Sequence, residues 1–383
     1  MATTEDNNDI GGASQTPEAF RPSGAAILAP PTAFQGGALP PGAMVLIPLG
    51  PDGEPLPKPV VEGPVALTQE QMWKLLGFNG PAVQVQDQEG RPILIGVEDL
   101  LKALEEGHKA DPQDANKARI FALELMKHER HEKAEQVLGK IVARGGDADD
   151  WLRLGIVQTN LKKFDKAEGT LKGAANLAKE SPVPLLHLSK VYEEKQDAAK
   201  QEETLRKAID LAGNFLDAWV GLHAMIKAQK GADEADKALE ELANSDKQQK
   251  FAAPYIALQA VYVNDEATRE RALVFAKKAV ERDSNDPMSL LSLSSLYGQL
   301  GKLDEVEKLL RPHESKMLTD VRLANNYFEA LWQSRQIEKV TRFLNTLVRA
   351  ENAQVKQFAQ ERAQGIARFL QQLQQQATGG AKA

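Results

Sequence analysis

Residues 151–174 read WLRLGIVQTNLKKFDKAEGTLKGA, and the spacing of large and small residues in this stretch decides the fold. Trp151 opens it, Gly155 follows four residues later, and Ala167 and Leu171 repeat the four-residue step. Residues three and four apart share one face of an α-helix, so each half of the stretch has a continuous packing face. Because Gly155 and Ala167 are small, two helices can approach closely there. The stretch predicts a pair of closely packed helices.

The same pattern recurs along the chain at intervals close to 34 residues. Leucine or alanine occupies the position equivalent to Leu171 in each repeat, at Leu138, Leu171, Leu205, Leu239, Ala276, Leu310 and Leu344. A second anchor keeps step with it at Ala118, Trp151, Leu185, Trp219, Tyr255, Leu290 and Ala324. Repeats of this length are typical of stacked helical units, in which each unit buries its apolar face against its neighbours.

This pattern resembles that of the tetratricopeptide repeat (TPR) family, whose units are antiparallel helix pairs. The residues that match the family signature are Trp151, Leu154, Gly155, Phe164, Ala167, Leu171 and Ala174, then Trp219, Leu222, Ala235 and Leu239. The resemblance implies an all-α fold, a right-handed TPR-type α-solenoid of about seven helical hairpins in residues 111–353. Two departures have expected consequences. His223 at a small-residue position loosens or rearranges the packing, and Pro312 ends a helix after Leu310.

The regions outside the repeats differ in composition. Residues 1–65 hold 12 of the 20 prolines, which predicts a disordered N-terminal tail. Residues 66–110 are predicted to form a small α+β module, in which a strand hairpin lies beside short helices. The last of these helices is predicted to end at Gly107. Residues 354–376 predict a helix that caps the open end of the solenoid, or alternatively a seam for self-association. Residues 377–383 are expected to be a disordered tail.

Composition and motifs exclude several classes of function. The chain has no cysteine and a net charge of −7, which disfavours thiolate metal sites and nucleic-acid binding. The longest apolar stretch is too short to span a bilayer, and the acidic amino terminus does not resemble a secretory signal, so we expect a cytoplasmic protein. His128 and His131 are interpreted as solvated turn residues. No catalytic motif, metal site or cofactor site is predicted, and the chain is not expected to be an enzyme.

The TPR resemblance implies a concave face lined by the first helix of each unit. The family's groove positions fall on Arg119, Ile120, Leu123, Leu152, Arg153, Ile156, Leu186, His187, Lys190, Val220 and Ile256. The first half of this set is mostly apolar, which favours a helix or an extended apolar peptide as the partner. The leading hypothesis is a non-catalytic scaffold or adaptor for partner polypeptides. The alternatives are a cytosolic chaperone that shields an apolar client segment and a regulatory subunit of an enzyme complex.

One apolar segment interrupts the N-terminal tail. Its candidate docking residues are Met44, Val45, Leu46, Ile47 and Leu49. The hypothesis is that this segment docks onto the repeat array, either its own or that of a neighbouring copy. Docking onto a neighbour would make a homo-oligomer through the tail, as pairing of the C-terminal helices would through the other end of the chain.

Overall fold

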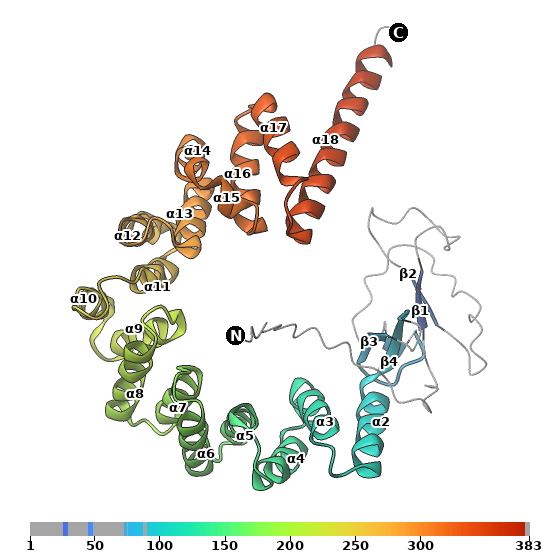
Figure 1. The fold of residues 1–383 in the computed structure, drawn as a ribbon, viewed down its shortest axis with the longest axis vertical. Helices are drawn as coiled ribbons and strands as arrows, with labels where there is room; N and C mark the ends of the chain where they lie inside the picture. Colours follow the sequence, from blue (N-terminus) through green and yellow to red (C-terminus); the bar gives the residue numbers. More distant parts are fainter. Residues whose placement is uncertain (1–25, 30–44, 49–72, 75, 87–89, 380–383) are drawn as a thin grey trace, which may run out of the picture. The chain divides into compact units, whose positions relative to one another are not determined.

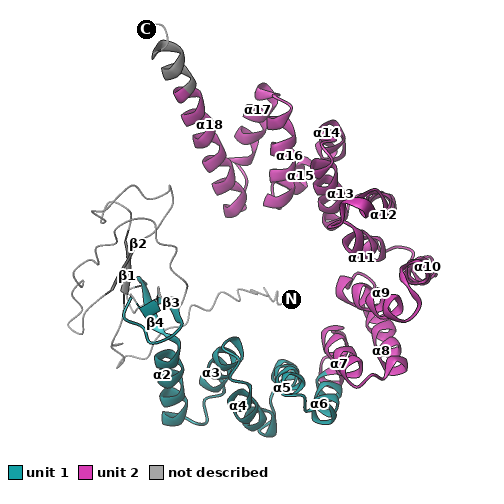
Figure 2. Cartoon of the chain, turned by 180° about the vertical axis from the view of Figure 1, so that it is seen from behind, with its two compact units in different colours: residues 1–174 teal, residues 175–383 magenta. Residues whose placement is uncertain are grey.

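A computed structural model describes residues 26–29, 45–48, 73–74, 76–86 and 90–379 (Figure 1). The described chain begins with strands, and all of its later elements are helical. It divides into two compact units, residues 1–174 and residues 175–383 (Figure 2).

A small antiparallel sheet lies in the first unit. Its strands are β1 (Ala26–Ala29), β2 (Val45–Pro48), β3 (Ala82–Gln86) and β4 (Pro92–Gly96), in the order β2-β1-β4-β3. The expected hairpin is present, because β3 pairs with β4. Buried side chains of this hairpin, such as Val85 and Ile95, pack with Leu100 of the helix that follows.

The sheet includes two short segments of residues 1–65. Two segments of that range, β1 and β2, are strands, and β1 joins them to β4. Val45, Leu46 and Ile47 of the candidate docking segment pair their backbone with β1. Pro48 fits there because it ends β2, an edge strand, where a missing N–H is tolerated. Met44 and Leu49 lie outside the described residues, as does the rest of the range.

Five helices follow the sheet in the first unit. They are α2 (Val97–Ala110), α3 (Ala115–Lys127), α4 (His131–Ala143), α5 (Ala148–Asn160) and α6 (Phe164–Leu177), and the boundary between the units falls within α6. The prediction that α2 ends at Gly107 is wrong. The helix continues for another three residues, because burial of its apolar face against α3 outweighs the modest cost of a helical glycine.

The second unit continues the same alternation. Its helices are α7 (Val183–Glu194), α8 (Ala198–Leu211), α9 (Leu216–Lys230), α10 (Ala232–Ala243), α11 (Ala253–Tyr262), α12 (Arg269–Arg282), α13 (Pro287–Gln299), α14 (Leu303–Leu310), α15 (Glu314–Met317), α16 (Val321–Gln333), α17 (Ile337–Leu347) and α18 (Ala353–Gly379). Short 3₁₀ turns precede α12 and α15. As expected, Pro312 stops α14 after Leu310, and a 3₁₀ turn and α15 follow.

Successive helices from α3 to α14, together with α16 and α17, form seven hairpins. All seven second-helix positions of the 34-residue period, from Leu138 to Leu344, are buried. The close approach predicted at Gly155 is present, because a Cβ at that position would lie only 2.5 Å from the Leu171 side chain. The first-helix anchors are less uniform. Trp219 is fully buried, whereas Trp151 is only half-buried.

The last helix is longer than expected. α18 runs from Ala353 to Gly379, beyond the predicted capping helix and into the range expected to be a tail. Val355 and Ala359 bury its first turns in the core of the second unit. Among the helices of the described residues, none combines the length and the apolar character that crossing a bilayer requires.

Candidate functional site: a groove between first helices

A hollow of about 350 Å³ is lined by α7, α8 and α9 in the second unit. Its lining includes Leu186, Lys190 and Glu193 of α7 and Asp217, Val220 and Ala224 of α9. Three of these residues, Leu186, Lys190 and Val220, are among the groove positions predicted from the sequence. The structure therefore brings together predicted residues from two different repeats.

The local structure of α9 explains why Val220 faces the hollow. Its neighbour Trp219 is fully buried and donates a hydrogen bond from Nε1 to the carbonyl oxygen of Gly213 (2.9 Å), which fixes the rotation of the helix. Val220 is consequently 36% exposed. At Gly221 a Cβ would lie 3.1 Å from Leu205, so α9 packs directly on α8 and the hollow keeps an apolar floor.

The hollow has charges of both signs around it. Lys190, Glu193 and Asp217 are exposed and line it together with apolar side chains. His187 lies next to this set on α7 and is partly buried. Burial, followed by the nearby charge of Lys190, lowers the pKa of His187, so its imidazole is neutral near pH 7. An apolar surface with mixed charges suits a polypeptide better than a strongly charged ligand.

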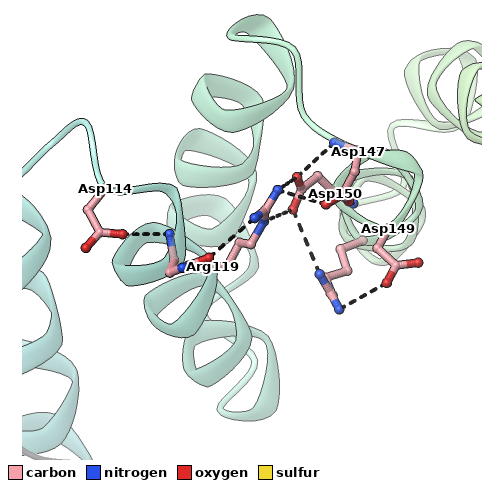
Figure 3. Close-up of polar contacts among 7 residues, drawn as sticks. Asp114, Arg119, Asp147, Asp149 and Asp150 are labelled. Carbon is pink, nitrogen blue, oxygen red and sulfur yellow. Dashed lines mark hydrogen bonds and ion pairs between the residues drawn. The ribbon is translucent and has the colours of Figure 1, made fainter. Parts of the chain in front are cut away.

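The predicted groove residue Arg119 in the first unit is held by carboxylates (Figure 3). It donates from Nε and Nη2 to the two carboxylate oxygens of Asp150 at 2.9 and 2.6 Å, and from Nη2 to Asp147 at 2.8 Å. Asp147 and Asp150 also form a capping box at the start of α5. Arg153 lies 3.7 Å from Asp149 and 3.9 Å from Asp150.

These contacts give Asp150 a structural role. Burial by itself raises the pKa of Asp150, but the hydrogen bonds from Arg119 and from the Asp147 backbone outweigh it and hold the pKa below its usual value. The carboxylate is therefore ionised and paired. Arg119 links α3 to α5, and it is not a free cation awaiting a ligand.

The remaining predicted groove residues differ in exposure. Ile120 is exposed, while Leu123, Leu152 and Ile156 are half-buried, all on first helices of the first unit. Ile256 is buried, so its prediction as a groove residue is wrong. The reason is that residues 252–259 are all buried, because α11 packs against α9, α12 and α13.

A buried polar cluster at His223 was missed by sequence reasoning. Asp236 accepts a hydrogen bond from His223 Nε2 at 2.8 Å, from the hydroxyl of Tyr262 at 3.0 Å and from Arg271 Nη2 at 2.6 Å. Arg271 also bonds Asp233 at 2.9 Å. The cluster joins α9, α10, α11 and α12. Burial, then the hydrogen bond to Asp236, raises the pKa of Tyr262 to about 12, so the phenol stays protonated as a donor.

Of the two alternatives expected at His223, looser or rearranged packing, the cluster shows the second. The bulky imidazole is accommodated because a carboxylate on the facing helix pairs with it, and each buried donor then has an acceptor. The available signal was Asp236 itself, a charged residue directly after Ala235 on the buried side of α10.

The other histidines do not form a metal site. In the part of the chain that the structure describes, no group of three His, Asp or Glu side chains has the geometry to hold a metal ion. The interpretation of His128 and His131 as solvated is wrong. Both are partly buried, and the Nε2 of His128 and the Nδ1 of His131 are shielded from solvent without a hydrogen-bond partner.

The hairpins, their 34-residue period and their small-residue contacts define a TPR-type α-solenoid. No protein-family model matches the chain, and no curated protein matches it. Among solved structures, MamA is similar at 17% identity and a TM-score of 0.35, over 46% of this chain and 94% of its own. YrrB, described as a TPR protein with an unusual peptide-binding site, is 18% identical over 50% of this chain and 97% of its own (TM-score 0.31). Yeast Tom70 is 13% identical over 71% of this chain and 60% of its own (TM-score 0.36).

Proposed function

We propose that this protein is a non-catalytic scaffold that binds a partner polypeptide in the hollow lined by α7, α8 and α9. The observation that supports the proposal is the convergence of Leu186, Lys190 and Val220 on that hollow. These residues come from two repeats, and each was selected from the sequence as a groove position.

The chemistry of the hollow favours a peptide with apolar side chains. Burying apolar area contributes about 25 cal/mol per Å² removed from water, and Leu186, Val220 and Ala224 provide that area. Lys190 and Asp217 place one charge of each sign at the hollow, where they can orient a peptide. We infer specificity for a short apolar stretch flanked by polar residues.

The buried polar groups support a non-catalytic role. Asp236 is already hydrogen-bonded to His223, Tyr262 and Arg271, and Asp150 is paired with Arg119. These groups therefore stabilise the packing of helices, and their donors and acceptors are engaged.

The test is selection from a random peptide library on the purified protein, followed by affinity measurements on the selected peptides. Val220→Glu places a charge in the hollow and should weaken binding about tenfold or more, which corresponds to about 1.4 kcal/mol. Val274→Glu is the matched control, because Val274 is 51% exposed on a second helix, α12. Equal affinity of the two variants, or no enrichment of apolar peptides, would contradict the proposal.

A further inference from the structure

The C-terminal helix has little packing over much of its length. From Gln360 to Gln372, Ile366 is the one residue that is not exposed. A helix gains most of its stability in a protein from packing an apolar face, and an unpacked helical segment in water is marginal. Phe369 and Leu370 nevertheless place two adjacent large apolar side chains here, 47% and 48% exposed. This part of α18 has the composition of an interface.

A hollow of about 310 Å³ lies beside the exposed pair, between α16 and α18. Phe328 and Trp332 of α16 and Gly365, Ile366 and Phe369 of α18 are among its lining residues. At Gly365 a Cβ would meet no atom within 4 Å, so the missing side chain leaves a notch in the surface of the helix.

The walls of this hollow are held in place by contacts within the chain. Arg362 donates a hydrogen bond to the side-chain oxygen of Asn325 at 3.0 Å, and its guanidinium lies 5.2 Å from the ring centre of Phe328. The ring of Trp332 packs edge-on against Phe369, with ring centres 6.2 Å apart. The hollow is therefore preformed, and a partner side chain entering it meets fixed aromatic surfaces.

The hollow and the exposed aromatic ring are self-complementary. Gly365 and Phe369 are four residues apart and lie on the same face of α18. When two copies of one helix cross in antiparallel orientation about a twofold axis, residue i of one meets residue j of the other, and j meets i. If the two helices cross on the face that carries Gly365 and Phe369, at the height of residue 367 along the helix axis, Phe369 of each copy lies over Gly365 of the other.

Charge is compatible with a second copy as the occupant. Arg368 is the one charged residue between positions 363 and 379. Of the charged residues that line the hollow, Glu329 and Arg362 form an ion pair at 3.4 Å, and Glu361 accepts a hydrogen bond from Gln357 at 2.8 Å. Two such helices therefore bring little unpaired like charge together. From the notch, the exposed ring and the low charge, we propose that the chain forms a homodimer through antiparallel packing of α18, with Phe369 of each copy seated beside Gly365 of the other.

The test measures the mass of the full-length protein by sedimentation equilibrium over a range of concentrations. The wild-type chain should be a dimer. Gly365→Leu should give a monomer, because its side chain fills the notch; helical content should be kept, since leucine favours helix more than glycine does. Ala367→Leu adds the same bulk on the opposite side of the helix and should stay dimeric. Phe369→Ala is the second variant and should also be monomeric.

Two results would overturn the proposal. A wild-type chain that remains monomeric at its highest soluble concentration would show that the face is covered by a different partner or by none. A dimer that survives both Gly365→Leu and Phe369→Ala would place the interface elsewhere on the molecule. Circular dichroism of each variant separates loss of the dimer from loss of the helix.

Discussion

Replacing Asp236 by alanine should destabilise the second unit far more than the same change three residues earlier in α10. Asp236→Ala removes the acceptor of His223 and Tyr262, both of which are buried. A buried donor left without a partner costs about 1–3 kcal/mol, so two of them cost about 2–6 kcal/mol. Arg271 is partly exposed, so its guanidinium can hydrogen-bond to water when Asp236 is removed. The loss of the bond between Arg271 and Asp236 therefore adds little.

Asp233→Ala is the matched control for this prediction. Asp233 also pairs with Arg271, but its side chain is 88% exposed. Exposed ion pairs contribute about 0–1 kcal/mol. Urea unfolding followed by circular dichroism gives the free energy of unfolding of each variant. The reasoning is refuted if Asp236→Ala costs no more than Asp233→Ala, since the cluster would then be solvated or replaceable.

Three further comparisons test other parts of the structure by thermal or urea unfolding. Trp219→Ala should cost about 3–5 kcal/mol, and Trp151→Ala should cost less, because only Trp219 is fully buried; equal costs would contradict the assigned burial. Gly155→Val should destabilise by about 1–3 kcal/mol because its side chain overlaps Leu171, whereas Gly139→Ala, in open space on α4, should stabilise by about 0.5–1 kcal/mol. Because the pKa of His187 is lower in the folded chain, the unfolded chain takes up a proton on this imidazole at a higher pH than the folded chain does. The free energy of unfolding therefore falls as pH drops below about 6.5. His187→Gln should reduce that dependence between pH 7 and pH 5, while His108 and His313, whose pKa burial also lowers, keep part of it; an unchanged slope would show that His187 does not contribute.

The repeats could be predicted from the sequence because they rest on local, periodic features. A buried position every 34 residues, small residues at helix contacts and Pro312 each act within one hairpin. The convergence of Leu186, Lys190 and Val220 on one hollow follows from the same periodicity. These features repeat, so each unit supports the interpretation of the next.

What the sequence did not indicate depends on pairs that are distant along the chain. The pairing of β1 with β2 and β4 is set by backbone hydrogen bonds between separate segments, and no local sequence pattern indicates these hydrogen bonds. The repeat position of Arg119 predicts a groove residue, but its ion pair with Asp150, 31 residues away, cannot be derived from the repeat spacing. Ile256 occupies a groove position in the repeat, yet neighbouring helices cover it.

Site-specific photo-crosslinking tests the proposed groove most directly. A photo-reactive amino acid is placed at Val220 in one variant and at Val274 in another, and each is irradiated with a peptide selected on the wild-type protein. The groove proposal predicts that position 220 crosslinks to the peptide, that unlabelled peptide competes this crosslink away, and that position 274 gives only background levels. Crosslinks at position 274 equal to or stronger than those at position 220 would contradict it.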